Sequence, residues 1–178
     1  MSRYARAAAE AEHHSGGHTL AATEDAVAQR LTGLEVDMSA MAACQNLYRA
    51  AGAVRNRLEQ TVLAPHQLTW TGWVVLWVVW IWEEIETRHV AVEAGISKGT
   101  LTGVVKTLET RGLLRRSVHP DDARRVLVSL TPAGQELMLS LFPRFNEQET
   151  AVTAGLGMQG TADLAHLLRT MVLELEKS

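Results

Sequence analysis

The chain of 178 residues contains one cysteine and no hydrophobic run long enough to span a bilayer. Cys44 alone excludes an intramolecular disulfide and a cysteine-based zinc site, and it agrees with a reducing compartment. The most apolar run, WVVLWVVWIW at residues 73–82, ends at Glu83, Glu84 and Glu86, which we interpret as the polar end of a buried helix. A membrane-spanning helix needs roughly 20 apolar residues, and no secretory signal segment precedes this run. We therefore expect a cytoplasmic protein with no membrane partner.

The sequence also lacks the motifs of common enzymes. It has no nucleophile elbow, no phosphate-binding glycine loop and no paired His/Glu metal motif. His13, His14 and His18 lie in a segment that we expect to be disordered, and we do not expect them to hold a metal. The sequence therefore predicts a protein that is not an enzyme and that carries neither cofactor nor metal.

Positive charge is scarce overall but concentrated in one segment. The net charge is −3, which taken alone argues against a nucleic-acid partner. Residues 97–125, however, hold seven basic against three acidic residues, a local balance of +4. The basic residues are Lys98, Lys106, Arg111, Arg115, Arg116, Arg124 and Arg125. Local rather than total charge decides whether phosphates are attracted, so this segment is a candidate surface for nucleic acid.

Helical periodicity dominates the rest of the chain. Residues 1–36 form an N-terminal extension, partly disordered because its first 19 residues have almost no large apolar side chains. Apolar residues at steps of three and four then predict a long helix over 37–63, capped by Asp37. After a polar break, Thr69 caps a second helix, whose tryptophans form one stripe. They are Trp70, Trp73, Trp77 and Trp80. A last amphipathic helix carries Leu164, Leu168, Met171 and Leu175.

A helix-turn-helix is predicted in the basic segment. Ala91 is small enough to let two helices approach, and Gly95, four residues later, permits the tight turn between them. Ser97 caps the second helix, which ends at Gly112. Its buried face holds Leu101, Val105 and Leu108, and its outward face holds Lys98, Gly99, Thr102, Gly103 and Lys106. Two exposed glycines cost about 1 kcal/mol each, which is reasonable if DNA must come close.

A β-hairpin follows, with strands at 113–118 and 125–130 and a loop at 119–123. We expect Arg124 or Arg125 at its tip, where it could enter the minor groove, because a narrow minor groove attracts arginine. The alternative is a solvated hairpin whose aspartates pair with its arginines. With a helix-turn-helix directly upstream, the sequence favours a DNA-binding wing.

Residues 68–137 resemble the winged helix-turn-helix of the MarR family of bacterial transcription regulators. The resemblance is carried by Thr69, by AGISKGTL, by GLLRR, by the P-x-D-x-R wing and by LTPAG. It implies a mainly α fold with a small β-hairpin wing, in which a winged helix-turn-helix lobe (68–131) joins a helical dimerisation lobe (37–63 and 132–178). The resemblance also implies that 37–178 form one MarR-type unit, that Asp122 braces Arg124, and that the tryptophan helix lies beside a cleft for a small effector.

The predicted function is a homodimeric repressor that binds a near-palindromic operator in double-stranded DNA and is released by a small molecule. We expect the effector to meet Trp73, Trp77 and Tyr48. The DNA-binding residues are expected to be Ser97, Lys98, Gly99, Thr100, Thr102, Lys106, Arg116, Asp122, Arg124 and Arg125.

Two alternatives stay open. In the first, Cys44 senses peroxides, as in the organic-hydroperoxide sensors of the same family: Tyr48 has the spacing of their tyrosine, whereas Leu58 replaces their second one. Cys44 also lies on the apolar stripe of its helix, where a cysteine can be a small core residue. In the second alternative, the chain is a dimeric interaction protein that does not bind DNA.

Overall fold

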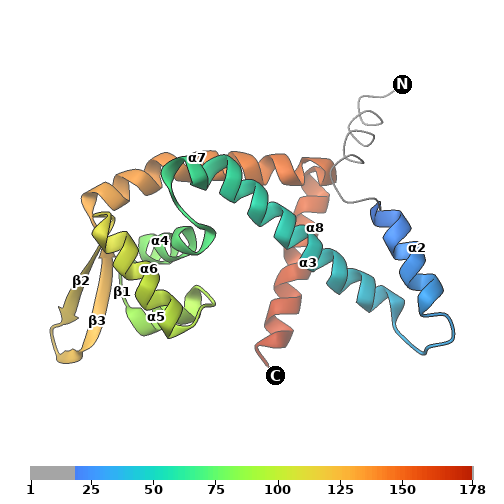
Figure 1. Cartoon of the computed structure of the whole chain (residues 1–178), viewed down its shortest axis with the longest axis horizontal. Coiled ribbons are helices and arrows are strands. Elements are labelled where there is room, and N and C mark those ends of the chain that lie inside the picture. Colours follow the sequence, from blue (N-terminus) through green and yellow to red (C-terminus); the bar gives the residue numbers. More distant parts are fainter. Residues whose placement is uncertain (1–18, 178) are drawn as a thin grey trace. The chain divides into compact units, whose positions relative to one another are not determined.

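The computed structural model describes residues 19–177, apart from the side chain of Ala123. Residues 1–18, which make up nearly all of the segment expected to be disordered and include the histidines at 13, 14 and 18, lie outside these residues. Figure 1 shows helices α2 (Leu20–Arg30), α3 (Met38–Leu58), α4 (Trp70–Trp82), α5 (Thr87–Glu93), α6 (Lys98–Thr110), α7 (Pro132–Thr153) and α8 (Gly157–Leu175), with strands β1 (Glu84–Glu86), β2 (Leu114–His119) and β3 (Asp122–Leu130). Contacts divide the chain into two units between Ala51 and Gly52, within α3.

The first unit contains α2 and the first part of α3. Asp37 caps α3 as predicted, because its Oδ1 accepts a hydrogen bond from the Ala40 backbone N–H at 2.8 Å. Asn46 on α3 donates to Glu24 on α2 at 3.0 Å, which joins the two helices. No residue of α2 is buried, so α2 adds little apolar burial to this unit.

The second unit begins with the end of α3 and the predicted polar break. A π-helical turn (Glu59–Leu63) and a 3-10 turn (Ala64–His66) lead to Gln67, which has a left-handed φ of 53°. The guanidinium of Arg111, at the end of α6, donates to the carbonyl oxygens of His66 and Gln67, both at 2.8 Å. Thr69 then caps α4 by accepting from Gly72 N–H at 3.1 Å. The predicted break and cap are confirmed.

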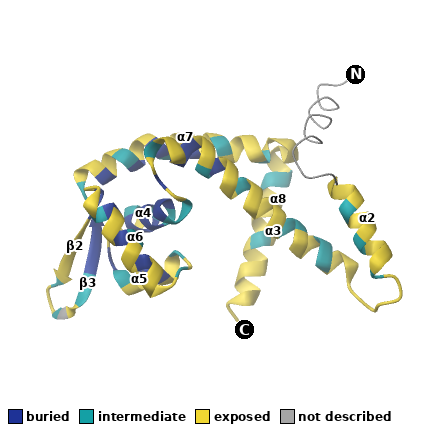
Figure 2. Ribbon diagram, in the orientation of Figure 1, coloured by how far each residue is buried: buried dark blue, intermediate teal, exposed yellow. Residues whose placement is uncertain are grey.

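Helix α4 lies at the centre of the hydrophobic core, which Figure 2 shows in dark blue. The predicted tryptophan stripe faces α7: Trp73 stacks on Phe145 with ring centroids 4.5 Å apart, and Trp77 stacks on Phe142 at 5.1 Å. Such aromatic pairs contribute about 0.5–1.5 kcal/mol beyond their area burial. Val75, Leu76 and Val79, on the other sides of α4, are fully buried. Helix α4 is therefore buried on most sides.

None of the described helices has the length and hydropathy needed to cross a membrane.

The sheet has three antiparallel strands in the order β1-β3-β2, one more than the predicted hairpin. The sequence around Glu83, Glu84 and Glu86 reads as the polar end of a helix, and that interpretation is wrong for β1. Glu83 breaks the helix with a positive φ of 60°, and Ile85 is buried opposite Val128 of β3. The predicted five-residue loop is also too long, since β2 ends at His119 and β3 begins at Asp122.

The C-terminal helices begin as predicted. Thr131 caps α7 by accepting from Gly134 N–H at 3.1 Å, and Pro132 takes the first helical position. Helix α8 has an apolar face, yet it has no buried residue in the described chain. Leu164, Leu167 and Leu175 are 41%, 61% and 74% exposed. This face is unlike the core of the unit, where comparable side chains are covered.

We predict that Gly134→Ala destabilises the protein by about 1–3 kcal/mol, the usual cost of forcing an extra carbon into a packed site. A Cβ at Gly134 would overlap the carbonyl oxygen of Leu113, a backbone atom that cannot move aside alone. Gly103→Ala is the matched control, because a Cβ there meets nothing within 4 Å and should add up to about 1 kcal/mol of helix stability. Thermal unfolding compares the two variants, and equal midpoints would contradict this packing.

Candidate nucleic-acid interface

Helices α5 and α6 form the predicted helix-turn-helix. Ala91 on α5 is 8% exposed at the helix contact, and Gly95 adopts a φ of 62° in the turn. The Ile96 N–H donates to the Ala91 carbonyl oxygen at 3.0 Å and closes the turn. Ser97 caps α6, because its Oγ accepts from the Thr100 N–H at 3.1 Å and also bonds the Thr100 hydroxyl at 2.9 Å. These local contacts set the direction of α6.

Helix α6 has one buried and one exposed face, as its spacing predicts. Leu101, Val105 and Leu108 are each 2% exposed. The residues predicted to face outward are all exposed: Lys98, Gly99, Thr102, Gly103 and Lys106. The side chains of Lys98 and Lys106 make no hydrogen bond or ion pair within residues 19–177. Two cations and a hydroxyl are thus presented on one side of the helix.

A hollow of about 160 Å³ lies between α6 and the hairpin, and Lys98, Thr102 and Arg116 line it together. The structure thereby brings three predicted DNA-binding residues to one place, joined by Thr87 from α5. The Arg116 guanidinium is bound to the Glu109 carboxylate, which sequence reasoning missed. This hydrogen bond lowers the pKa of Glu109 and raises that of Arg116. Arg116 is consequently fixed against α6.

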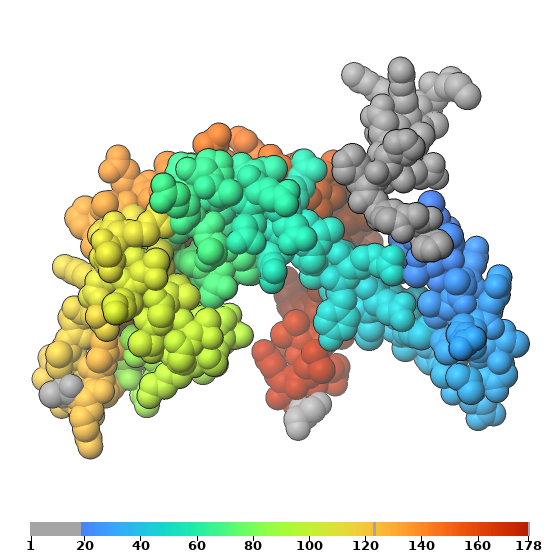
Figure 3. Space-filling model, in the orientation of Figure 1, coloured from blue at the N-terminus to red at the C-terminus, as the bar shows by residue number. Residues whose placement is uncertain are grey.

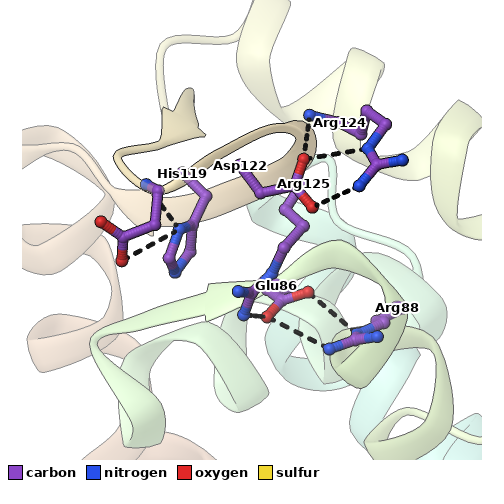
Figure 4. A network of polar contacts seen from close by, with 7 residues as sticks. Glu86, Arg88, His119, Asp122, Arg124 and Arg125 are labelled. Carbon is purple, nitrogen blue, oxygen red and sulfur yellow. Dashed lines mark hydrogen bonds and ion pairs between the residues drawn. The ribbon is translucent and has the colours of Figure 1, made fainter.

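Arg124 projects from the start of β3 with its side chain 91% exposed. The Asp122 carboxylate braces it, as the resemblance implied: Oδ1 accepts from Arg124 Nε at 3.1 Å, and Oδ2 accepts from an Arg124 terminal nitrogen at 3.3 Å (Figure 4). Oδ1 also accepts from the Arg124 backbone N–H at 3.0 Å. The hydrogen bond from the Arg124 side chain is the largest cause of the lowered pKa of Asp122. The arginine is therefore held in one orientation and remains open to solvent.

Arg125 does not lie at the tip, which corrects one of the two placements predicted for the hairpin. Residues 120 and 121 separate the strands, and the Arg125 guanidinium points away from Arg124 to the carboxylate of Glu86 (Figure 4). Glu86 stands 39 residues away in the sequence, so no local pattern indicates this contact. The alternation of side chains along a strand could have shown that Arg124 and Arg125 face opposite ways.

Much of the predicted basic segment serves the fold. Arg111 binds backbone carbonyl oxygens, Arg115 Nε donates to Ser129 Oγ at 2.9 Å, and Arg116 and Arg125 bind glutamates. Of the seven basic residues, Lys98 and Lys106 make no side-chain contact of this kind within residues 19–177, and Arg124, which Asp122 braces, has a side chain that is 91% exposed. Helix α6 and the hairpin, yellow to gold in Figure 3, lie side by side on the surface of the second unit. This surface has the shape and charge to meet DNA with a helix and a hairpin.

The predicted effector residues separate into two groups. Trp73 and Trp77 line a cavity of about 280 Å³ together with Trp70, Val74, Phe142, Phe145 and Glu149. Tyr48 and Cys44 belong to the first unit and are exposed on α3.

Within residues 19–177, no three metal-binding side chains come together as a metal site.

Comparisons with known proteins agree with this geometry. The model of the MarR family matches residues 68–126. The chain is 37% identical over 134 residues to the uncharacterized HTH-type transcriptional regulator YwaE of Bacillus subtilis, covering 75% of this chain and 78% of that protein.

Two solved structures are similar over the same region. BpsR of Bordetella bronchiseptica, whose DNA binding is regulated by 6-hydroxynicotinic acid, has a TM-score of 0.68 at 29% identity, covering 73% of this chain and 98% of that one. NadR in complex with 4-hydroxyphenylacetate has a TM-score of 0.62 at 25% identity, covering 73% and 89%. Since a relative more than 30% identical matches over most of both chains, this chain belongs to the MarR family of DNA-binding, helix-turn-helix transcriptional regulators, which are not enzymes.

Proposed function

We propose that the chain acts as a homodimeric repressor that binds a near-palindromic operator and is released by a small-molecule effector. The observation that carries the proposal is the exposed polar face of α6 beside the braced Arg124 of the hairpin. In this proposal residues 68–131 are the winged helix-turn-helix, residues 37–63 and 132–178 form the dimerisation helices, and residues 1–36 are an extension. The protein acts in the cytoplasm.

Helix α6 enters the major groove in this proposal. Its N-terminal turn carries Ser97, Lys98, Gly99 and Thr100, and Thr102 and Lys106 follow on the exposed side. Serine, threonine and lysine bind phosphates, and threonine can also reach base edges. Arg116 and Asp122 hold the wing, and Arg124 enters the minor groove. A dimer would place two such modules on half-sites about one helical turn apart.

The exposed face of α8 supports the homodimer. Its apolar side chains recur at steps of three and four, which places Leu164, Leu167 and Met171 on one face. Large apolar patches on a protein surface mark interaction sites. A second copy of the same helix offers the same chemistry, and a two-fold axis matches the symmetry of a palindromic operator.

The aromatic cavity supports a small effector. Its volume of about 280 Å³ is close to the lower end of ligand pockets, roughly 300 Å³, and suits a molecule with one ring. Two proteins similar to this chain respond to or hold aromatic acids: the DNA binding of BpsR is regulated by 6-hydroxynicotinic acid, and NadR forms a complex with 4-hydroxyphenylacetate. Here the one charged residue of the lining is Glu149, whose Oε2 accepts from Asn146 Nδ2 at 3.0 Å. A carboxylate at this place disfavours an acid, so we propose a neutral or cationic aromatic effector.

The thiol mechanism is the second candidate, and the exposure of Cys44 favours it. A redox-sensing thiol must be reachable by its oxidant. A core role for Cys44 within one chain does not fit this exposure, although a second subunit could cover it. An interaction protein without DNA binding does not account for the helix-turn-helix and the braced arginine.

We predict that Arg124→Ala weakens binding to the region upstream of the protein's own gene by about 1–3 kcal/mol, the usual contribution of a specific contact. The side chain is exposed and supports no buried group, so the fold should not change. Arg30→Ala removes the same charge from α2, outside the proposed DNA interface and the proposed dimerisation helices, and serves as the control. Fluorescence anisotropy with labelled duplex measures both. Equal affinity of wild type and Arg124→Ala would remove the wing from the mechanism.

We predict that Leu167→Glu converts a dimer into a monomer and abolishes operator binding, because it places a charge in the middle of the proposed α8 interface. Val92→Glu makes the same change on α5, where the side chain is 78% exposed, and should leave the dimer intact. Light scattering coupled to size-exclusion chromatography gives the masses. A wild-type monomer at micromolar concentration would overturn the dimeric proposal.

All five tryptophans lie on α4, so tryptophan fluorescence reports on the proposed effector cavity. We predict that 6-hydroxynicotinamide binds several-fold more tightly than 6-hydroxynicotinic acid, and that Glu149→Gln narrows this difference by about fivefold, equivalent to about 1 kcal/mol at 4 Å in water. Trp77→Ala should weaken both ligands, whereas Cys44→Ser should change neither. Tighter binding of the acid by wild type would refute the assigned charge preference.

A further inference from the structure

Glu86 occupies the N-cap position of α5 but does not cap it. Its backbone is extended, with φ −66° and ψ 140°, and its side chain accepts no hydrogen bond from the first turn of the helix. The carboxylate instead binds two arginines: Oε2 lies 2.9 Å from Arg88 Nε, and Oε1 binds the Arg125 guanidinium (Figure 4). Glu86 thus connects the first helix of the helix-turn-helix to strand β3 of the wing.

The contact between Glu86 and Arg125 is the more enclosed of the two. The Glu86 side chain is 8% exposed, compared with 37% for Arg125 and 65% for Arg88. Arg125 Nε is buried and has no hydrogen-bond partner among the described residues. An unsatisfied buried donor is unfavourable, so the ion pair must hold Arg125 in this position against that cost.

Both partners are charged at any pH at which DNA binding is measured. The hydrogen bond from Arg125 is the largest cause that lowers the pKa of Glu86 from 4.5 to about 2. The pair therefore contributes its full stability above pH 4.5 and loses it only as the pH falls toward 2. It is a permanent link rather than a physiological pH switch.

Neighbouring arginines consequently have different surroundings. Arg124 is 91% exposed and braced by Asp122, whereas Arg125 is directed to the opposite side of the strand, where it shares the buried Glu86 carboxylate with Arg88. We propose that Glu86 is a positioning residue that withholds Arg125 from the DNA backbone, so that Arg124 alone of the two contacts DNA. This inference rests on the proposed role of the hairpin as a DNA-binding wing.

Withholding one cation limits binding that does not depend on sequence. Each phosphate neutralised by an arginine releases counterions and adds affinity for any duplex. With Glu86 neutralised, Arg125 would be free to bind a phosphate beside the wing. Affinity for random DNA would then rise more than affinity for the operator, and discrimination between them would fall.

Glu86→Gln is the direct test, because it keeps the shape of the side chain and removes the charge. Binding to a random duplex is measured at several salt concentrations for full-length protein. We expect the slope of log K against log salt to become steeper by about 0.9, the value for one additional phosphate contact. The double variant Glu86→Gln/Arg125→Gln should return to the wild-type slope.

Glu84→Gln is the matched control, since it removes the same charge from an exposed position on the same strand and should leave the slope unchanged. A merely structural role would lower the unfolding temperature and the affinity without changing the slope. If Glu86→Gln does not fold, Arg125→Gln alone decides: an unchanged slope supports the inference.

A shallower slope for Arg125→Gln would overturn the inference, because Arg125 would then already contact a phosphate in the wild type. An unchanged slope for folded Glu86→Gln would overturn it as well. Failure of the proposed function looks different. In that case the wild type does not bind duplex DNA, or Arg124→Ala binds it as tightly as the wild type. Either result is independent of the result for the Glu86 variants.

Discussion

Burial of α4 is the constraint on which the second unit depends. This helix contacts α5, α6, α7, β1 and β3, so the elements that present the candidate interface are packed around one apolar core. Fully burying a side chain such as Val75 or Leu76 contributes about 1.5–3 kcal/mol. Because valines and tryptophans occupy nearly all of the circumference of α4 up to Trp80, this part of the helix is stable only when neighbouring elements cover it. The direction of α6 and the position of the sheet follow from how they cover it.

Hydrogen bonds and ion pairs then hold most of the arginines at the edge of this core in place. Arg111 and Arg115 bind uncharged oxygens, and Arg116 and Arg125 bind glutamates. These contacts turn a run of positive sequence into a rigid scaffold with few free cations. Of the cations offered to DNA in the proposed interface, Arg124 is held by Asp122 before binding, which reduces the entropy that this side chain loses on association. The protein can be acidic as a whole because its attraction for DNA is local.

Sequence reasoning succeeded where the deciding contacts are local. Asp37, Thr69, Ser97 and Thr131 each accept a hydrogen bond from an N–H three residues later, and such caps can be read from residue type and spacing. The stripe of α4 was equally visible, because helical periodicity alone places tryptophans on one side.

Sequence reasoning failed where the two contacting residues are far apart in the sequence. Strand β1 has three residues, two of them glutamate, and exists because β3 lies beside it. The ion pairs of Arg116 and Arg125 are likewise tertiary, and charge counting treated these side chains as free. Tyr48 and the tryptophans were joined by family resemblance only, and they belong to different units of the fold.

The two hydrogen bonds from Arg111 have a mechanical consequence. They fasten the C-terminal end of α6 to the backbone of His66 and Gln67, immediately before α4. A rotation of α4 would therefore pull on α6 directly, with no intermediate element to absorb the strain. Such coupling is reciprocal. If a small molecule lowers the affinity for DNA by shifting α4, then bound DNA lowers the affinity for that molecule by the same factor.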